Sequence, residues 1–564
     1  MNSRKIPLLA AIFAAACSTL AATCGAANAA GGAVAPSGTT PQETAPAATP
    51  IRHLVVIFNE NVSFDHYFAT YPNAANPPGE PVFPATPAAP AVNNLASANL
   101  LTNNPNFTNT ANGADATEPF RLDRTQASTA TQDHRYTAEQ QAYNGGAADL
   151  FPKYTGRASA GGVGAFGTKG QVMGYYDGNT VTALWNYARH FAMSDNFFDE
   201  TYGPSTPGAI NLVSGQTNGM RMVATTKKPS TLAAVSYYVA DGQGGFTMIN
   251  DVDPGYDVCS VPGDQTMLEG KNIGDLLNAG RVTWGGFMGG FDLRTANANG
   301  TTGCARATHS PIVGSDVRDY VAHHNWFQYY ASTANPSHAR PSSAQTIGYS
   351  FQPGGTAADP ANHEYDLQDF YAAVKAGNYP AVSFIKLPAY QDGHAGYSDP
   401  LDEQTGTVEV INFLQQQPGW KDTAVIVTWD DSDGWYDHAF ARTSNPSFDP
   451  EADQLNGPGK CGEGIARAGV AGKPANGRCG PGTRLPFLLI SPWAKANYIS
   501  HDRISEASVT RFIEDNWLHG ARLGGGSFDE TAGSIMDLFD LSSGGRNGVL
   551  YLDPATGTPV ASPP

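Results

Sequence analysis

Two pairs of polar residues stand directly after short apolar runs that have the composition of buried strands. The run Val425–Trp429 ends on Asp430-Asp431, and the run Leu54–Phe58 is followed by Glu60-Asn61. Adjacent carboxylates repel each other and are costly to desolvate, so such a pair needs either solvent or a neutralising cation. If the two strands are neighbours, three carboxylates and an amide oxygen converge, a set that suits a divalent cation. A solvated turn or a helix cap is the alternative for either pair alone.

A serine at the start of an expected helix is the candidate nucleophile. Ser205 lies in "GPSTPGAINLVSGQT", between a proline and an apolar helical stretch. A serine at this position is usually an N-cap. A helix N-terminus also attracts phosphate, and a nearby cation would lower the pKa of the hydroxyl and activate it. No G-x-S-x-G elbow surrounds Ser205, which argues against an α/β-hydrolase site.

Four histidines stand in contexts that favour a site over a surface role. Neutral or charged imidazoles could bind phosphate oxygens, and one could protonate a departing alcohol. Taken singly, each of these histidines is better explained by a structural or surface role. They are His134 in "QDHRY", the pair His323 and His324 in "AHHNWFQYY", and His394 in "YQDGHAGYSDP".

Strand-like and helix-like segments alternate through the chain. The expected strands are 54–58, 381–388, 423–429 and 485–492, with a helix and then a strand within 273–290. The expected helices are 133–146, 181–198, 403–417 and 504–520, and 72–118 is expected to be a weakly structured surface insertion. This alternation predicts an α/β fold with a mostly parallel central sheet, whose sites collect beyond the carboxyl ends of the strands.

Composition allows a large core and argues against one class of partner. The chain has 564 residues, of which 41% are hydrophobic, and a formal net charge of −18. Such an acidic surface argues against binding to nucleic acid, although a small anionic substrate needs only a local positive site. No segment after the N-terminus has 18 unbroken apolar residues, so we expect no stable insertion into a membrane.

The N-terminus has the pattern of an export signal. Residues 1–29 carry Arg4 and Lys5, then an Ala-rich apolar run, and end on a small-x-small cleavage pattern. This predicts a signal peptide and a periplasmic or secreted protein. The composition further predicts a disordered linker over 30–50, one domain over 51–552 and a disordered tail over 553–564.

Four cysteines remain after the expected signal peptide. An even number in an exported chain suggests disulfides, and local pairing closes the shorter loops. We therefore expect Cys259 to pair with Cys304 and Cys461 with Cys479, with free thiols as the alternative. A zinc site is disfavoured because no C-x-x-C spacing occurs.

Six ordered blocks resemble the bacterial acid phosphatase and phospholipase C family, which belongs to the alkaline-phosphatase-like superfamily. The blocks are "VIFNENVSFDHYFATYPNA", "QDHRYTAEQQAYNGG", "FFDETYGPSTPGAINLVSGQT", "HHNWFQYY", "YQDGHAGYSDPLDEQ" and "VTWDDSDGWYDH". The resemblance implies an alkaline-phosphatase-like three-layer α/β sandwich with surface insertions. The first block of the family usually reads E-N-R-S-F-D, so Val62 stands where the family has arginine, and one positive charge is missing.

The resemblance also implies roles for individual residues. One divalent ion, with Ca, Mg, Mn, Fe and Zn all open, would be held by Glu60, Asn61, Asp430 and Asp431, close to the nucleophile Ser205. Asn61, His134 and His323 would bind the phosphate, and His324 or His394 would serve as the acid.

The function implied is that of a secreted acid phosphatase acting on small phosphomonoesters through a phosphoserine. A phospholipase C that cleaves phosphatidylcholine-type diesters is the alternative within the family. A catalytically inactive module that binds phosphoanions is the alternative from another class.

Overall fold

The computed structural model describes residues 46–84, 90–224, 237–351, 357–542, 544–545 and 547–563. The chain divides into Met1–Thr39 and Thr40–Pro564, and all described residues belong to the second unit. The expected signal peptide and most of the expected linker lie outside the described residues. Among the described helices, none has the length and the apolar composition that a membrane crossing requires.

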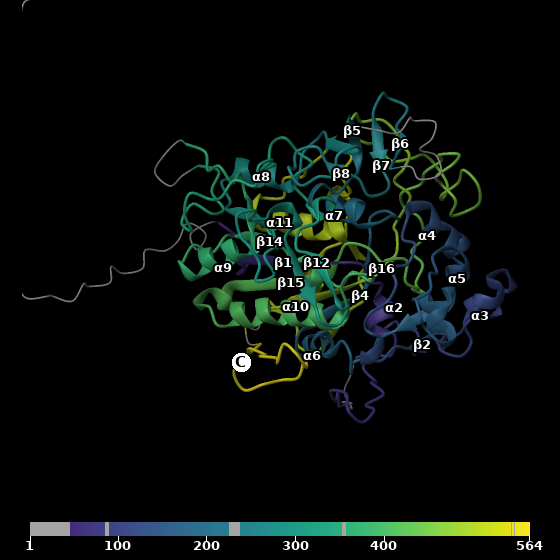
Figure 1. The fold of residues 1–564 in the computed structure, drawn as a ribbon. Coiled ribbons are helices and arrows are strands. Elements are labelled where there is room, and N and C mark those ends of the chain that lie inside the picture. The colour runs from purple at the N-terminus through teal and green to yellow at the C-terminus, as the bar shows by residue number, and fades with distance from the viewer. Residues whose placement is uncertain are drawn as a thin grey trace, which may run out of the picture. The chain divides into compact units, whose positions relative to one another are not determined.

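A large central sheet carries the fold (Figure 1). Its path runs β13-β10-β14-β1-β15-β16-β4-β17, and β18 also pairs with β4. Neighbouring strands are parallel except that β16 runs antiparallel to both β15 and β4. The expected mostly parallel sheet is therefore confirmed. The strands are β1 His53–Asn59, β4 Ala192–Phe198, β10 Trp284–Met288, β13 Glu364–Asp366, β14 Val382–Lys386, β15 Thr423–Trp429, β16 Arg484–Ile490, β17 Tyr498–Ser500 and β18 Ile504–Ser505.

Helices lie on both sides of this sheet. In Figure 1, α7, α8 and α11 lie on one side of the central strands and α6 and α10 on the other. The α-helices are α2 Phe64–Phe68, α3 Pro105–Thr108, α4 Tyr136–Tyr143, α5 Phe151–Tyr154, α6 Thr182–His190, α7 Ser205–Ser214, α8 Ile273–Gly280, α9 Leu367–Lys375, α10 Pro400–Gln415 and α11 Glu506–Trp517.

Smaller sheets and two disulfides complete the described chain. A five-stranded sheet has the order β6-β7-β5-β9-β8, and β2 pairs with β3 and β11 with β12. The expected disulfides Cys259–Cys304 and Cys461–Cys479 are both present. The remaining strands are β2 Phe120–Arg121, β3 Gly174–Tyr175, β5 Asn218–Ala224, β6 Tyr238–Ala240, β7 Phe246–Met248, β8 Asp253–Pro254, β9 Gln265–Leu268, β11 Ala307–Ser310 and β12 Ser315–Arg318.

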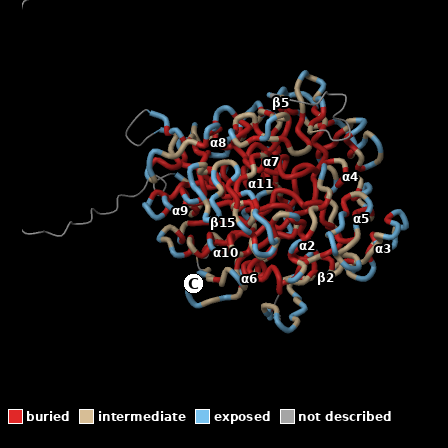
Figure 2. The backbone as a smooth tube through the Cα atoms, in the orientation of Figure 1, coloured by how far each residue is buried: buried red, intermediate tan, exposed pale blue. Residues whose placement is uncertain are grey.

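The central strands form because their residues are apolar on both faces. Every residue of β1, β14, β15 and β16 is buried, and the sheet lies within the buried interior shown in Figure 2. Near-continuous runs of Val, Ile, Leu and Phe suit strands that are covered on both sides. Helix starts also follow local chemistry, since the Asp399 side chain accepts hydrogen bonds from the N–H groups of Leu401 and Asp402 and thereby caps α10.

One expectation is corrected by the structure. The helix expected over 181–198 ends at His190, and Ala192–Phe198 forms β4, because these residues pair with β16, β17 and β18. In the described part of the chain after 553, the Gly557 carbonyl accepts from the Asn186 side chain and the Ala555 carbonyl accepts from the Gln404 side chain.

Candidate active site

The two ligand pairs of the sequence emerge side by side. β1 and β15 are parallel neighbours in register, with Asn59 opposite Trp429, so Glu60-Asn61 and Asp430-Asp431 leave the same edge of the sheet. The Asn61 N–H donates to Asp430 Oδ1 at 3.2 Å. Asn61 has a φ of 53°, a left-handed conformation that asparagine tolerates better than most residues. The turn thus directs its amide toward the aspartates.

Helix α7 brings Ser205 to this edge. Ser205 Oγ lies 2.9 Å from Glu60 Oε2, 3.2 Å from Asp431 Oδ2 and 3.3 Å from Asn61 Oδ1. The close approach depends on Gly208, because a Cβ there would meet the Asp430 carbonyl oxygen at 1.9 Å. The three stretches of chain that carry Glu60-Asn61, Ser205 and Asp430-Asp431 therefore converge.

The oxygens gathered here fit a cation. Besides the contact with Ser205, Asn61 Oδ1 lies 2.6 Å from Glu60 Oε2, 2.9 Å from Asp430 Oδ1 and 3.3 Å from Asp431 Oδ2. Oxygen atoms that only accept hydrogen bonds do not approach one another this closely without a donor or a positive charge between them. Rotating the Asn61 amide would supply a donor, and a bound divalent cation would supply the charge. Carboxylate, amide and hydroxyl oxygens are the donors that hard divalent ions prefer.

A buried lysine that sequence reasoning missed belongs to the same cluster. Lys386, the last residue of β14, forms an ion pair with Glu60, and its Nζ lies 3.2 Å from Asp430 Oδ2. Burial opposes its charge, but the carboxylates of Asp430 and Glu60 outweigh this and raise the pKa of Lys386. Three carboxylates and one ammonium leave a formal charge of −2, which a divalent cation balances.

Burial beside other carboxylates raises the pKa of both aspartates. Burial and the neighbouring Glu60 carboxylate raise the pKa of Asp430 to about 8. Burial also raises the pKa of Asp431 well above its ordinary value, opposed by His134 and assisted by Asp430. A positive charge bound here would reverse these shifts and keep both groups ionised.

His134 and His394 face the opposite end of the Asn61 amide. Its nitrogen lies 3.1 Å from His394 Nε2 and 3.5 Å from His134 Nε2. The Nδ1 atoms of the two rings contact the carbonyls of Ala395 and Gln132, at 2.6 and 3.0 Å. Because a carbonyl only accepts, each Nδ1 carries a proton and each Nε2 is presented to the site.

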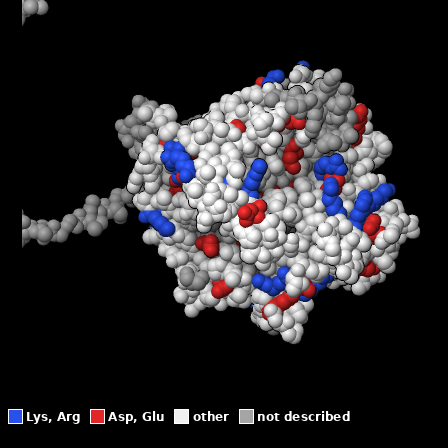
Figure 3. Space-filling view, in the orientation of Figure 1, with Lys and Arg blue, Asp and Glu red and all other residues white. Residues whose placement is uncertain are grey.

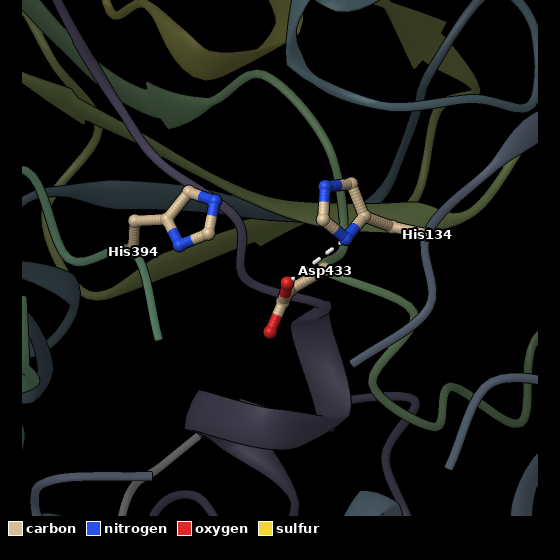
Figure 4. Close-up of side chains that lie close together, drawn as sticks. All are labelled: His134, His394 and Asp433. Atoms are coloured by element: carbon tan, nitrogen blue, oxygen red, sulfur yellow. Dashed lines mark ion pairs between the residues drawn. The ribbon is translucent and has the colours of Figure 1, made fainter. Parts of the chain in front are cut away.

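His134 has a carboxylate partner. Figure 4 shows its ring near that of His394, with its Nδ1 paired to Asp433 Oδ1 at 3.0 Å. Burial opposes the charge of His134, but the carboxylates of Asp431 and Asp433 raise its pKa well above the ordinary value. A positively charged imidazole here can offset charge on a bound phosphate.

His323 and His324 come from one short helical turn but lie in different surroundings. His324 is buried, with Nδ1 3.0 Å from Glu60 Oε1, and burial together with His323 and Lys386 lowers its pKa well below the ordinary value. His323 is partly exposed and lies 3.3 Å from Asp253 Oδ1. Burial opposes its charge, but Asp253 and Asp251 raise its pKa.

Glu139 of α4 joins the nucleophile loop to the aspartate loop and was also missed. Its Oε2 accepts from the Gly203 N–H at 3.0 Å, and its Oε1 accepts from Ser432 Oγ at 2.6 Å. Gly203 lies two residues before Ser205, and Ser432 follows Asp431. Burial raises the pKa of Glu139 to about 7. The carboxyl group therefore positions two loops at once.

Two cavities flank the helix start that carries Ser205. A cavity of 320 Å³ is lined by Pro204, His134 and Asp251, among others, and one of 250 Å³ by His323, Asp251 and Asp253. Tyr237 and Asp251 line both cavities. A substrate bound at Ser205 therefore has room for substituents in two directions.

A comparison with models of protein families shows to which family the chain belongs. The model of the phosphoesterase family matches residues 51–518, which contain every candidate residue described above. The chain belongs to the phosphoesterase family. The resemblance seen in six ordered sequence blocks is thereby confirmed at the level of the family.

Relatives in the phosphoesterase family bear phospholipase names. This chain is 26% identical over 288 residues to the non-hemolytic phospholipase C of Burkholderia pseudomallei, covering 49% of this chain and 34% of that protein. It is 23% identical to the non-hemolytic phospholipase C of Pseudomonas aeruginosa, covering 83% of this chain and 54% of that protein. It is also 23% identical to phospholipase C A of Mycobacterium tuberculosis, covering 82% of this chain and 72% of that protein. The matches thus span about a third to a half of the first two relatives.

Proposed function

We propose that this chain is a metal-dependent phosphoric ester hydrolase with Ser205 as its nucleophile. The observation that carries the proposal is the convergence of Ser205 Oγ with Glu60, Asn61 and Asp431 at 2.9 to 3.3 Å. Glu60, Asn61, Ser205, Asp430 and Asp431 would hold one divalent cation. When bound, that ion lowers the pKa of the serine hydroxyl and offsets the charge of the phosphate. An alkaline-phosphatase-like sandwich is the fold proposed for this chemistry.

Each residue of the site has a separate role in the proposed reaction. Ser205 Oγ forms a bond to phosphorus while the bond from phosphorus to the ester oxygen breaks. The serine proton passes to Glu60, whose Oε2 already accepts from Oγ at 2.9 Å. Water then attacks the phosphoserine and gives a proton to the histidine that protonated the leaving alcohol, while the bond between phosphorus and Oγ breaks and the proton on Glu60 returns to Ser205. Asn61, His134 and His323 stabilise charge on the phosphate oxygens.

Protonation of the leaving oxygen falls to a histidine. His324 is held neutral by burial, so it is poorly suited to give up a proton. His394 is less buried and presents Nε2 to the site, and we propose it as the acid. A mechanism that uses charged histidines implies an acidic optimum, in keeping with an acid phosphatase.

Phospholipase C activity on phosphodiesters is the second candidate. The names of the relatives favour it, and the two cavities beside Ser205 leave room for two substituents on phosphorus. Rates with 4-nitrophenyl phosphate and with 4-nitrophenylphosphorylcholine, measured from pH 5 to 7, separate a monoesterase from a diesterase. We further propose that the chain works in the periplasm or outside the cell, since two disulfides suit an oxidising compartment.

Replacing the nucleophile tests the proposal directly. We expect Ser205→Ala to lower turnover of 4-nitrophenyl phosphate by about 1,000-fold or more, with orthovanadate binding retained in calorimetry. Ser214→Ala is the matched control at the other end of α7, where the hydroxyl donates to the carbonyls of Ile210 and Gln216. Full activity of Ser205→Ala would refute the assignment. A wild-type chain that binds vanadate but turns over no ester would favour the inactive module.

The cation is tested by removing it. Dialysis against a chelator should abolish turnover, and adding back Mg²⁺, Ca²⁺, Mn²⁺, Zn²⁺ or Fe²⁺ one at a time should identify the ion that restores it. Undiminished turnover in the chelated protein, with no metal detected by elemental analysis, would contradict the proposal.

A further inference from the structure

We propose that the larger cavity beside His134 is a subsite for a second anionic group of the substrate, held by Arg157 and Arg135. The inference rests on the proposed hydrolysis at Ser205. It deepens that function by naming the class of substrate: phosphate esters that carry a further phosphate or carboxylate away from the scissile bond.

The position of the cavity connects it to the nucleophile. Its 320 Å³ are lined by Pro204, which precedes Ser205, and by His134, whose Nε2 faces Asn61. Arg135 and Arg157 line the same cavity. A group attached to a phosphate at Ser205 can therefore extend past His134 toward the two guanidinium groups.

The charges around the cavity leave an excess of one positive charge at the arginines. Arg135 binds both carboxylate oxygens of Asp133, through Nε at 2.7 Å and Nη2 at 2.6 Å. Arg157 reaches the same carboxylate with Nη2 alone, at 3.0 Å. One carboxylate thus serves two guanidinium groups. A guanidinium has five N–H donors in a fork that matches phosphate and carboxylate oxygens.

The other carboxylate at the cavity is already engaged. Asp251 Oδ1 accepts from both the N–H and the hydroxyl of Thr206, each at 2.9 Å. Burial opposes its ionisation, but His323 and His134 outweigh this and lower its pKa. Its charge is therefore offset by the histidines of the phosphate site and does not cancel that of Arg157.

The smaller cavity is lined by carboxylates instead of arginines, so an anionic group is expected to bind in the larger cavity. Its carboxylates are Asp251, Asp253 and Asp264, with His323 as the cationic partner of Asp253. Figure 3 shows basic side chains gathered on the face over the region of α4 and α5, the helices that flank Arg135 and Arg157. In a chain of net charge −18, this local excess of positive charge directs an anionic substituent to one side of Ser205.

The exposure of the two arginine side chains determines how much they can contribute to binding. The side chains of Arg135 and Arg157 are 47% and 53% exposed. Water and salt screen contacts at such groups, so the effect on binding is moderate and declines with ionic strength. Exposure also means that these arginines can be replaced without disturbing the core.

A matched pair of substrates tests the subsite. Release of inorganic phosphate is measured from fructose 6-phosphate and from fructose 1,6-bisphosphate, which differ by the second phosphate. We expect the wild-type kcat/KM ratio to exceed the statistical factor of about two that two cleavable phosphates allow. Arg157→Gln should lower that ratio about threefold, toward the statistical value. Asp133→Asn, which frees both guanidinium groups, should raise it.

The control is Arg221→Gln. Arg221 is an exposed arginine on β5 that is paired with Glu269, and its replacement should leave the ratio unchanged. Equal losses for both substrates in Arg157→Gln, or a wild-type ratio at the statistical value, would overturn the subsite while leaving hydrolysis at Ser205 in place. Calorimetry of the two sugar phosphates with Ser205→Ala tests the subsite without turnover. If that variant binds the bisphosphate no more tightly than the monophosphate, the subsite is refuted even in a chain that hydrolyses neither.

Discussion

Replacing Lys386 with methionine removes the positive charge that separates two buried carboxylates. Lys386 Nζ contacts Glu60 and lies 3.2 Å from Asp430 Oδ2, and all three side chains are almost completely buried. Methionine keeps most of the volume and the unbranched shape of lysine. The substitution therefore changes the charge of the cluster from −2 to −3 with little change in packing.

The cost can be worked from this geometry. At about pH 9, above the pKa of Asp430, both groups are charged, and at an effective dielectric constant near 20 unit charges 3.2 Å apart attract by about 5 kcal/mol, before the cost of burying the ammonium is subtracted. Removing one partner of a buried ion pair typically costs about 3–5 kcal/mol because the other charge is left uncompensated. We expect a loss of this size in the free energy of unfolding of the metal-free protein.

Urea denaturation at about pH 9 in the presence of a chelator measures this loss, since Asp430 is ionised there. Lys421→Met is the matched control, because Lys421 is exposed and its contact with Asp422 is 3.6 Å long, so no resolvable loss is expected. A divalent cation should bind the −3 cluster more tightly, so adding the ion should raise the melting temperature of Lys386→Met by more than that of the wild type. If Lys386→Met is as stable as the control without metal, or if added metal stabilises it less than the wild type, this electrostatic account of the site is wrong.

Two further substitutions test buried charges near the site. Arg484→Met should lower the free energy of unfolding by about 3–5 kcal/mol in urea denaturation, because it leaves Asp437 buried without its cation, whereas Asp65 keeps its contact with His438. Exposed Arg221→Met is the control, and an equal response of the two variants would contradict this role. Glu139 has a pKa of about 7 in the folded protein against an ordinary value of 4.5, so folding favours its protonated form and the wild type loses stability as pH rises from 4.5 through 7. Glu139→Gln should remove that loss of stability, which amounts to about 3 kcal/mol at 1.36 kcal/mol per pKa unit. Denaturation series at pH 5 and at pH 8 measure it. Parallel pH profiles of the variant and the wild type would show that Glu139 is not held protonated.

The ligand pairs could be predicted because their position depends on one local rule. Each follows a largely apolar strand, and parallel strands present their carboxyl ends at one edge of a sheet. The sequence therefore predicted that Glu60-Asn61 and Asp430-Asp431 leave the same edge, and the pairing of β1 with β15 in the structure makes them neighbours. Lys386 follows the same rule, since it is the last residue of β14, but it lies inside the expected strand 381–388, and a single lysine there has no visible partner until β14 is known to pair with β1.

The segment that was predicted wrongly shows where local patterns fail. α6 and β4 are separated by one residue, Phe191, and both are almost entirely buried, so one long apolar pattern covers two elements. Only pairing with β16 and β17 makes 192–198 a strand, and those partners lie far along the chain. The contacts of Glu139 are likewise long-range, joining α4 to Gly203 and Ser432, and no spacing in the sequence encodes them.

The place of β1 in the sheet has a consequence for biosynthesis. The first strand to leave the ribosome is a central one, and Leu54 waits for Val382 and Ala424 before either of its edges is covered. At about 5–20 residues per second, translation takes on the order of tens of seconds to supply those partners. Throughout that interval both edges of a largely apolar segment are uncovered, so aggregation of the nascent polypeptide is favoured most before β14 and β15 have been made.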